Sequence, residues 1–326
     1  MAISRPLTFR PLYQTLVWGG RRLCAWRKDL PAGPVGESWE ISDHARGESV
    51  VEAGPYRDRT LSDLVRDEGE ALLGKAQRPG PFPLMVKLID AKQRLSVQVH
   101  PDDDLARSMG VGENGKTECW VFLASGGEVF QGVRKGIDAP LFRRALDSMQ
   151  LEATLNRFEA HEADVFFLPA RTLHALGEDC LVYELQQTSD VTFRVYDWDR
   201  MGLDGKPRQL HVEESLHTID FAPRSYGPIR PPWRKTEFGL GHRLAECAYF
   251  SLDELSVDGV FALPTEGSFV LITCLTGTCL LSGPKGEIAL PAMRTALIPA
   301  DVGSLRVEPL GPATVLVARP GPDLLR

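Results

Sequence analysis

The sequence lacks the features that mark membrane, secreted or nucleic-acid-binding proteins. It has no apolar run of about 18 or more residues, the length that a membrane-spanning helix requires, and no segment resembling a signal peptide. It also has no basic cluster, and its net charge is −7. Neither nucleic acid nor a membrane is therefore expected as a partner, and we expect a soluble, cytoplasmic protein.

Cysteines are few and scattered. No two of the six form a C-x-x-C pair. This spacing argues against a disulfide framework and against a cysteine-rich zinc site, and reduced thiols fit a cytosolic compartment.

Proline and glycine, by contrast, are abundant and spread along the chain, with 24 and 30 residues. They suit a protein of many strands and turns, so the expected fold class is mainly β with a few flanking helices. Apolar periodicity predicts helices over about 61–73, with Thr60 as the N-cap, over about 140–149 and over about 212–219.

The length of 326 residues suggests two domains. We expect the first over 1–222 and a β-rich C-terminal domain over 236–326, joined by an extended, proline-rich linker over 223–235. In the C-terminal domain, the strands predicted over 269–275 and 278–282 indicate a hairpin.

One stretch alternates apolar and polar residues, Leu95-Ser96-Val97-Gln98-Val99-His100-Pro101. A period of two predicts a half-buried strand, which Pro101 ends and a turn at 102–104 follows. Short, directional polar groups suit the lining of a wet cavity. We expect Ser96, Gln98 and His100 to face into a barrel, with His100 binding a metal; the alternative is a solvent-facing strand with one histidine.

Two later segments offer further ligands. Lys116 and Glu118 share one face at the start of an apolar strand, and His174 follows a strand and a turn. Two imidazoles, a carboxylate and the Gln98 amide oxygen would suit zinc or another divalent first-row metal. The alternatives are a surface Lys–Glu pair and ordinary histidines.

Two more strands carry charged residues. Glu184 and Arg194, near a divalent metal, could shuttle a proton and hold an oxyanion, or they could form an ion pair at the barrel rim. In the loop that follows, Asp197 and Arg200 are expected to be turn and ion-pair residues. Trp18, beside two glycines, either walls a pocket or packs in the core.

The chain resembles the type I mannose-6-phosphate isomerases (phosphomannose isomerases) in their short bacterial form. The resemblance covers most of the first 220 residues and rests on six motifs in the same order: Trp18-Gly19-Gly20, Gly36-Glu37-Ser38-Trp39, the Leu95–Pro101 stretch, Gly115-Lys116-Thr117-Glu118-Cys119-Trp120, Pro169 to Leu176, and Gln187 to Arg200. The proline-rich stretch and the C-terminal region match only loosely.

The resemblance implies a cupin fold, a metal-centred antiparallel β-barrel of the jelly-roll kind, with a second barrel-like domain that lacks metal ligands. It also implies the site. The metal, usually zinc, falls on Gln98, His100, Glu118 and His174; catalytic roles fall on Arg194, Glu184 and Lys116; and Ser96, Lys116 and Trp18 are assigned to the substrate.

The second cupin motif, G-x5-P-x-G-x2-H, is met from Ala163 through Pro169 and Arg171 to His174. Ala163 and Arg171 replace its glycines, which are turn positions. The run 167–174 also resembles 297–304, where a serine takes the place of the histidine, which is consistent with two related barrels or with chance.

The implied reaction interconverts mannose 6-phosphate and fructose 6-phosphate by proton transfer between C2 and C1 through a cis-enediol(ate). Because the chain has no P-loop or GxGxxG cradle, scattered side chains would bind the phosphate. Two alternatives stay open: a cupin isomerase of a free sugar such as mannose, and a non-catalytic sugar-sensing module. We expect a monomer or a weak homo-oligomer.

Overall fold

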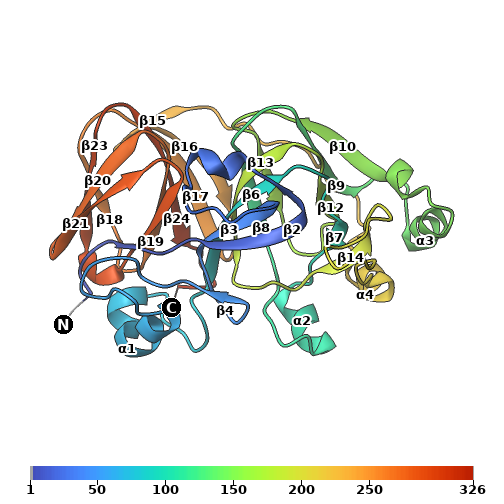
Figure 1. The fold of residues 1–326 in the computed structure, drawn as a ribbon, viewed down its shortest axis with the longest axis horizontal. Coiled ribbons are helices and arrows are strands. Elements are labelled where there is room, and N and C mark those ends of the chain that lie inside the picture. The colour runs from blue at the N-terminus through green and yellow to red at the C-terminus, as the bar shows by residue number, and fades with distance from the viewer. Residues whose placement is uncertain (1–2, 326) are drawn as a thin grey trace. The chain divides into compact units, whose positions relative to one another are not determined.

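A computed structural model, which describes residues 3–325, divides the chain into two compact units (Figure 1). The first unit comprises 1–12, 39–86 and 230–326, and the second comprises 13–38 and 87–229. This division does not follow the sequential one expected from the sequence, 1–222 and 236–326. The N-terminal strand shows why, because Leu7 pairs with Leu297 and thus belongs to a sheet made mostly by the C-terminal third.

Two antiparallel sheets hold the motifs of the second unit. The first has the order β10 (Leu155–Ala160), β9 (Gly127–Val133), β12 (His174–Leu176), β7 (Val97–Val99) and β14 (Phe193–Tyr196). The other has the order β11 (Val165–Leu168), β8 (Glu118–Phe122), β13 (Cys180–Gln187), β6 (Leu84–Ala91), β2 (Leu12–Gly20) and β3 (Val35–Ile41).

Apolar packing closes these sheets into a barrel. One buried cluster takes Trp120 and Phe166 from the six-stranded sheet and Val129 and Leu176 from the five-stranded sheet, so the two sheets face each other across it. A second cluster covers the outer face of the five-stranded sheet. Side chains alternate between the faces of a strand, so the residues between the outward-facing apolar ones point into the barrel.

Four helices flank the sheets, and their caps explain their bounds. Helix α1 (Leu61–Leu73) starts where the Thr60 side chain accepts from the Asp63 N–H, and α3 (Ala139–Asp147) starts after Asp138 in the same way. Helix α4 spans Val212–Thr218. These three match the predicted helices. No described helix is long and apolar enough to cross a membrane.

The fourth helix, α2 (Asp103–Met109), was not predicted. A turn was expected at 102–104, but Asp102 is the N-cap of this helix, and Asp103 and Asp104 form its first turn. The Asp102 carboxylate caps it by accepting from the Leu105 N–H at 2.8 Å. Gly110 ends it with a left-handed backbone. Three short 3₁₀ segments, η1 (Arg22–Ala25), η2 (Leu151–Thr154) and η3 (Ala300–Val302), complete the helical content of the described chain.

The first unit is also built from antiparallel sheets. Seven strands have the order β1 (Leu7–Thr8), β22 (Arg294–Ile298), β19 (Val270–Thr276), β24 (Ala313–Pro320), β17 (Phe250–Val257), β16 (Gly239–Glu246) and β15 (Arg234–Thr236). Four more have the order β18 (Phe261–Pro264), β23 (Ser304–Pro309), β20 (Thr278–Gly283) and β21 (Gly286–Pro291), and β4 (Asp43–His44) pairs with β5 (Gly47–Glu48).

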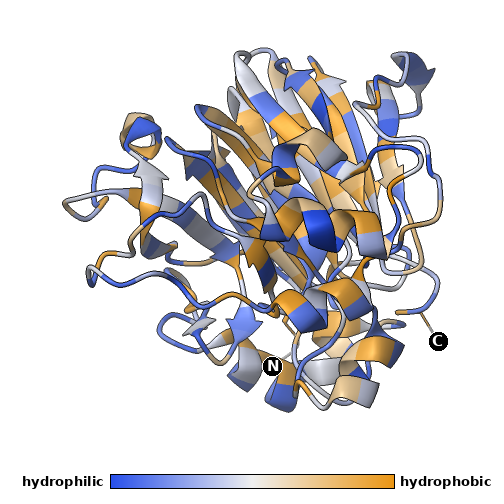
Figure 2. Cartoon of the chain, turned by 90° about the vertical axis from the view of Figure 1, so that its right-hand side faces the viewer, coloured by the Kyte–Doolittle hydropathy of each residue, from blue (hydrophilic) through white to orange (hydrophobic). Residues whose placement is uncertain are grey.

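The predicted hairpin of β19 and β20 is wrong. The two strands belong to different sheets, and the turn at Gly277, with φ +76°, carries the chain from one sheet to the other. The similarity between 167–174 and 297–304 has a structural counterpart. In each run the chain leaves one sheet and enters another at the same point of the motif, between β11 and β12 in the first and between β22 and β23 in the second. Figure 2 shows hydrophobic and hydrophilic residues interspersed along the strands, as expected where one face of a sheet is buried.

The segment predicted as a linker is extended, and part of it is bound to the second unit. Ile229 exchanges backbone hydrogen bonds with Val165 of β11, and the Gly227 N–H donates to the Gln131 side chain at 2.9 Å. Residues up to 229 therefore belong to that unit, and the chain leaves it at Arg230.

Candidate metal centre and active site

Strand register brings the predicted ligands together inside the second-unit barrel. His174 on β12 lies opposite Gln98 on β7, and Arg194 on β14 lies opposite Gln98 from the other side. Directly opposite residues share a face, so these three side chains point the same way. Val97 and Val99 pack in the outer cluster, as the alternation predicted. Leu95, the third apolar residue of the pattern, lies before β7 and packs in the inner cluster instead. Glu118 comes from the facing sheet, at the start of β8.

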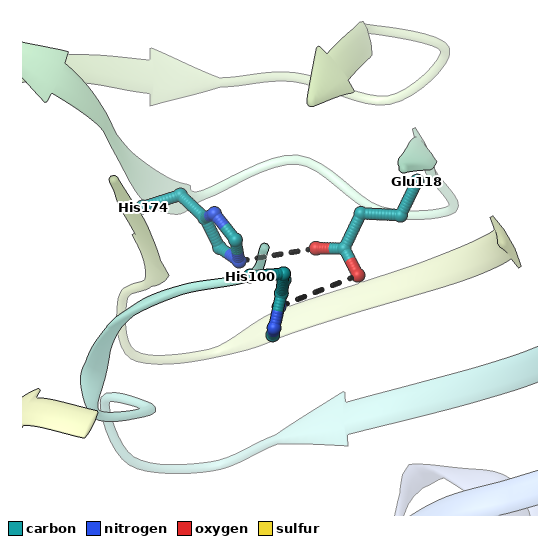
Figure 3. Close-up of side chains that lie close together, drawn as sticks. All are labelled: His100, Glu118 and His174. Atoms are coloured by element: carbon teal, nitrogen blue, oxygen red, sulfur yellow. Dashed lines mark ion pairs between the residues drawn. The ribbon is translucent and has the colours of Figure 1, made fainter. Parts of the chain in front are cut away.

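His100, Glu118 and His174 form a buried group whose ligand atoms all lie within 4.8 Å of one another (Figure 3). His174 Nε2 lies 3.1 Å from Glu118 Oε1, and His100 Nε2 lies 3.8 Å from Glu118 Oε2. The side chains are at most 2% exposed. They come from positions 100, 118 and 174, which only the fold brings into contact.

Backbone carbonyls orient both imidazoles. His100 Nδ1 lies 2.7 Å from the Val191 carbonyl oxygen, and His174 Nδ1 lies 2.8 Å from that of Thr172. A carbonyl can only accept, so each Nδ1 carries the hydrogen, and in the neutral ring each Nε2 presents a lone pair to the cluster. Burial holds the pKa of His100 well below its usual range, and Lys116 acts in the same direction. This orientation by a carbonyl on the far nitrogen is typical of metal-binding histidines.

The Glu118 carboxylate supplies an anionic donor. Burial by itself would raise its pKa, but Lys116, with Nζ 2.7 Å from Oε2, acts together with His174 and His100 to outweigh burial and hold the pKa well below its usual range. Both buried oxygens lack a hydrogen bond of good geometry from the described residues. Two imidazole nitrogens and a carboxylate with open lone pairs therefore fit a divalent first-row cation.

Gln98 lies at the same point. Its amide nitrogen is 3.4 Å from His174 Nε2 and 3.5 Å from His100 Nε2, and its oxygen accepts from Ser96 Oγ at 3.2 Å. Amide oxygen and nitrogen are assigned from their neighbours, and exchanging them turns the oxygen toward both imidazoles. The position of Gln98 thus supports the prediction of a fourth ligand.

Lys116 is held just before β8 by close backbone packing. Its N–H donates to the Pro101 carbonyl at 3.0 Å, and the Gly115 N–H donates to the Asp103 carboxylate of α2 at 2.8 Å. A Cβ on Gly115 would lie 2.4 Å from the Asp103 nitrogen, so this close approach requires glycine. The packing directs the buried Lys116 ammonium to Glu118 and to His100 Nε2, 3.3 Å away.

Ser96 and Arg194 lie beside the cluster. The Arg194 Nε donates to Ser96 Oγ at 3.2 Å, and its Nη1 donates to the Gln209 carbonyl at 2.9 Å. Ser96 in turn donates to Gln98. A guanidinium is thus linked through one hydroxyl to a predicted metal ligand.

Glu184 belongs to a second charged group. Its Oε2 accepts from the Trp120 indole N–H at 2.7 Å, and its Oε1 lies 3.7 Å from Lys87 Nζ. Lys87 also approaches Glu37 at 3.3 Å. Burial raises the pKa of Glu184, and Glu118 adds to this. The Trp120 ring meets the His174 ring edge-on at 5.4 Å, which connects the two groups.

Sequence reasoning missed Lys87. It lies in the middle of an apolar strand, where every residue of β6 is buried. Lysine is rarely buried without a charged partner. A lysine inside an apolar strand was therefore the sequence feature that could have indicated a buried charged group. Trp18 is 3% exposed and packs in the apolar cluster with Ile89 and Trp120, which favours a packing role.

Known proteins resemble this chain over nearly its full length. A profile of the phosphomannose isomerase type I catalytic domain matches residues 7–117. Mannose-6-phosphate isomerase ManA of Bacillus subtilis is 33% identical over 309 residues, which cover 94% of this chain and 96% of the relative. The mannose-6-phosphate isomerase of Streptococcus mutans is 32% identical over 312 residues, covering 94% and 96%.

A solved structure agrees. The crystal structure of the Bacillus subtilis mannose 6-phosphate isomerase has a TM-score of 0.88 and 30% identity, covering 97% of this chain and 99% of that chain. A two-sheet barrel enclosing two imidazoles and a carboxylate that could hold a metal ion defines a protein of the cupin fold. The chain belongs to the type I mannose-6-phosphate isomerase (phosphomannose isomerase) family, as its sequence motifs predicted.

Proposed function

We propose that the protein interconverts mannose 6-phosphate and fructose 6-phosphate with one divalent metal, zinc being the best match, held by Gln98, His100, Glu118 and His174. The observation that carries the proposal is the convergence of both Nε2 atoms on a buried carboxylate whose oxygens accept no hydrogen bond of good geometry from the described residues. The names of the full-length relatives supply the substrate.

The reaction moves one proton between neighbouring carbons of the open-chain sugar. A base removes the proton from C2 of the aldose, and the electron pair forms the C1–C2 double bond of a cis-enediolate whose charge lies on O1. Return of the proton to C1, with transfer of the hydroxyl proton from O2 to O1, gives the ketose. A bound divalent cation would polarise the sugar oxygens. Arg194, partly buried and aimed toward the cluster, stabilises the developing negative charge.

Glu184 is the proposed base. One of its oxygens is occupied by the Trp120 N–H, and the other accepts no hydrogen bond from the described residues, which supports proton transfer there. Its raised pKa lies in the direction that a general base at neutral pH needs. If Glu184 instead only organises the pocket, Glu184→Gln will keep the shape of the pocket and most of the turnover.

Lys116 and Ser96 are proposed to position the substrate, with the Lys116 ammonium as the proposed contact of its phosphate or of an anionic oxygen. Lys116 is a buried cation beside the cluster, and Ser96 bridges Gln98 and Arg194. The predicted binding of substrate by Trp18 requires the substrate to contact the apolar cluster in which Trp18 packs.

Isomerase assays on apo and zinc-reconstituted protein test the proposal, with fructose 6-phosphate detected as the product of mannose 6-phosphate and fructose as the product of free mannose. We expect zinc-dependent turnover of mannose 6-phosphate. Turnover of free mannose alone would reject the phosphosugar assignment and favour the free-sugar isomerase. Metal binding without turnover of either sugar would favour the sugar-sensing module.

A further inference from the structure

The guanidinium of Arg194 is held by a loop that the proposed chemistry does not use. The loop follows β14 and returns at His211, whose N–H donates to the Arg194 carbonyl at 2.7 Å. Just before this return, the Gln209 carbonyl accepts from Arg194 Nη1 at 2.9 Å. The position of Gln209 therefore decides where that end of the guanidinium lies.

The two stems of the loop are joined by one buried carboxylate. Asp197, 5% exposed, accepts from Arg208 through both of its oxygens, with Nε at 2.7 Å from Oδ2 and Nη2 on Oδ1. Arg200 Nη2 donates to Oδ1 at 2.7 Å. A bidentate arginine–carboxylate pair fixes orientation as well as distance, and Arg208 is the residue next to Gln209.

The rest of the loop is anchored around this pair. Trp198 and Asp199 have φ of +57° and +52°, a left-handed backbone that non-glycine residues adopt only when their surroundings hold it. The Trp198 indole donates to the Leu95 carbonyl at 2.7 Å, and Arg200 Nη1 donates to the Arg94 carbonyl at 2.6 Å. Both acceptors immediately precede Ser96, which holds the other end of the Arg194 guanidinium.

We propose that the Asp197–Arg208 pair positions Arg194 for the isomerisation. The inference rests on the proposed role of Arg194 in that reaction. The pair closes the loop and holds Gln209 against Nη1, so that the guanidinium is fixed between Gln209 and Ser96 before substrate arrives. Arg208 is a positioning residue and not a substrate ligand, because its Nε and Nη2 are both bound to Asp197.

Charge balance supports the same arrangement. Arg200, Arg208 and Arg194 lie near one another, and Asp197 is the carboxylate that binds the first two. Burial lowers the pKa of Arg194, and the nearby Arg208 lowers it further, while Asp197 opposes this. Removing the Asp197 charge would therefore leave the guanidinium groups repelling each other at the site.

A double-mutant cycle on the zinc-loaded full-length enzyme tests the inference, with Arg208→Gln and Arg194→Ala made singly and together. We expect Arg208→Gln to lower kcat by roughly 10-fold to 100-fold with little change in KM, the range for a displaced positioning group. In the Arg194→Ala background, the same substitution should change kcat by less than about 2-fold, because the group it positions is gone. Zinc content should be unchanged in all variants.

Arg143→Gln is the matched control, because it removes an exposed arginine of α3 that pairs with Asp147 and Glu213, away from the site. Its kcat should equal that of the wild type. A rise in KM alone for Arg208→Gln would show direct substrate binding, and equal losses in both backgrounds would show a general structural effect; either result overturns the inference. Full activity of Arg194→Ala would instead reject the proposed role of Arg194 itself.

Discussion

His174 Nε2 and Glu118 Oε1 lie 3.1 Å apart with no hydrogen bond of good geometry to the carboxylate. The Nδ1 hydrogen is committed to the Thr172 carbonyl, so a neutral His174 faces Glu118 lone pair to lone pair. Two buried acceptors at this separation repel unless a cation lies between or beside them. The fold thus maintains a donor set whose electrostatics favour a metal.

Replacing a ligand should therefore remove the metal. We expect His174→Ala to lose bound zinc and isomerase activity together, since loss of one imidazole leaves an incomplete donor set. Metal content by atomic spectroscopy and the isomerase assay check this. His217→Ala is the control, because His217 is exposed on α4 and should leave both values unchanged. A His174→Ala protein with wild-type zinc content would contradict the assigned site.

Metal removal should also lower stability. The cation binds the folded cluster and neutralises charge buried there, so it stabilises the folded state by mass action, by about 2.7 kcal/mol at a free concentration 100 times Kd. We expect chelation to lower Tm and zinc to restore it, measured by differential scanning fluorimetry. In Glu118→Gln, zinc should raise Tm much less. An equal zinc-induced shift in that variant would place the stabilising metal elsewhere.

Local patterns predicted much of this site. The alternation of apolar and polar residues around β7 indicated that Gln98 and His100 share a face. The predicted strand and turn before His174 indicated that this residue begins the next strand, where β12 starts. The ion-pair prediction for Asp197 and Arg200 is also confirmed, at 2.7 Å.

Non-local features could not be predicted in this way. Lys87 has partners at positions 37, 184 and 190, and no local spacing reports such distances. The hairpin error has the same origin, because β20 pairs with β21 and β23, and sequence adjacency to β19 says nothing about sheet membership. The assignment of β1 to the C-terminal sheet likewise depends on pairing across nearly 300 residues, from Leu7 to Leu297.

Arg194 should affect turnover without affecting the metal. We expect Arg194→Ala to retain zinc and lose kcat by roughly 10²-fold or more, the usual effect of removing a group that stabilises developing charge. Arg194→Lys should recover only part of the rate, because an ammonium cannot donate to Ser96 and Gln209 in the same geometry. Steady-state kinetics and metal analysis check this, and wild-type kcat in the alanine variant would contradict it.

The Asp197 carboxyl gives a pH-dependent contribution to stability. Burial would raise its pKa, but hydrogen bonds from Arg208 and Arg200 outweigh burial and lower it. A lowered folded-state pKa stabilises above the unfolded value of about 3.9, and this is lost as the pH falls through the folded-state pKa. We expect Asp197→Asn to lower Tm at pH 7, with a difference from wild type that shrinks below pH of about 4.

Asp204→Asn provides the control for that experiment. Asp204 is exposed in the same loop, and its Oδ1 accepts from the Lys206 N–H, a contact that asparagine can keep. Its Tm difference from wild type should be small at every pH. If Asp197→Asn and Asp204→Asn gave the same profile, the arginine pairs of Asp197 would not be the cause.

The two motif glycines that this chain replaces give a last prediction. Ala163 and Arg171 both adopt a left-handed backbone, with φ of +67° and +70°, so the turn geometry is retained without glycine. This conformation costs an L-residue about 1–2 kcal/mol. Glycine avoids that strain, but the greater conformational entropy of its unfolded state offsets part of the gain in stability. We expect Ala163→Gly to raise the free energy of unfolding by about 0.5–1 kcal/mol, measured by denaturant titration. Ala153→Gly, at an exposed 3₁₀ position without positive φ, should instead destabilise, and a loss in both variants would show that Ala163 is unstrained.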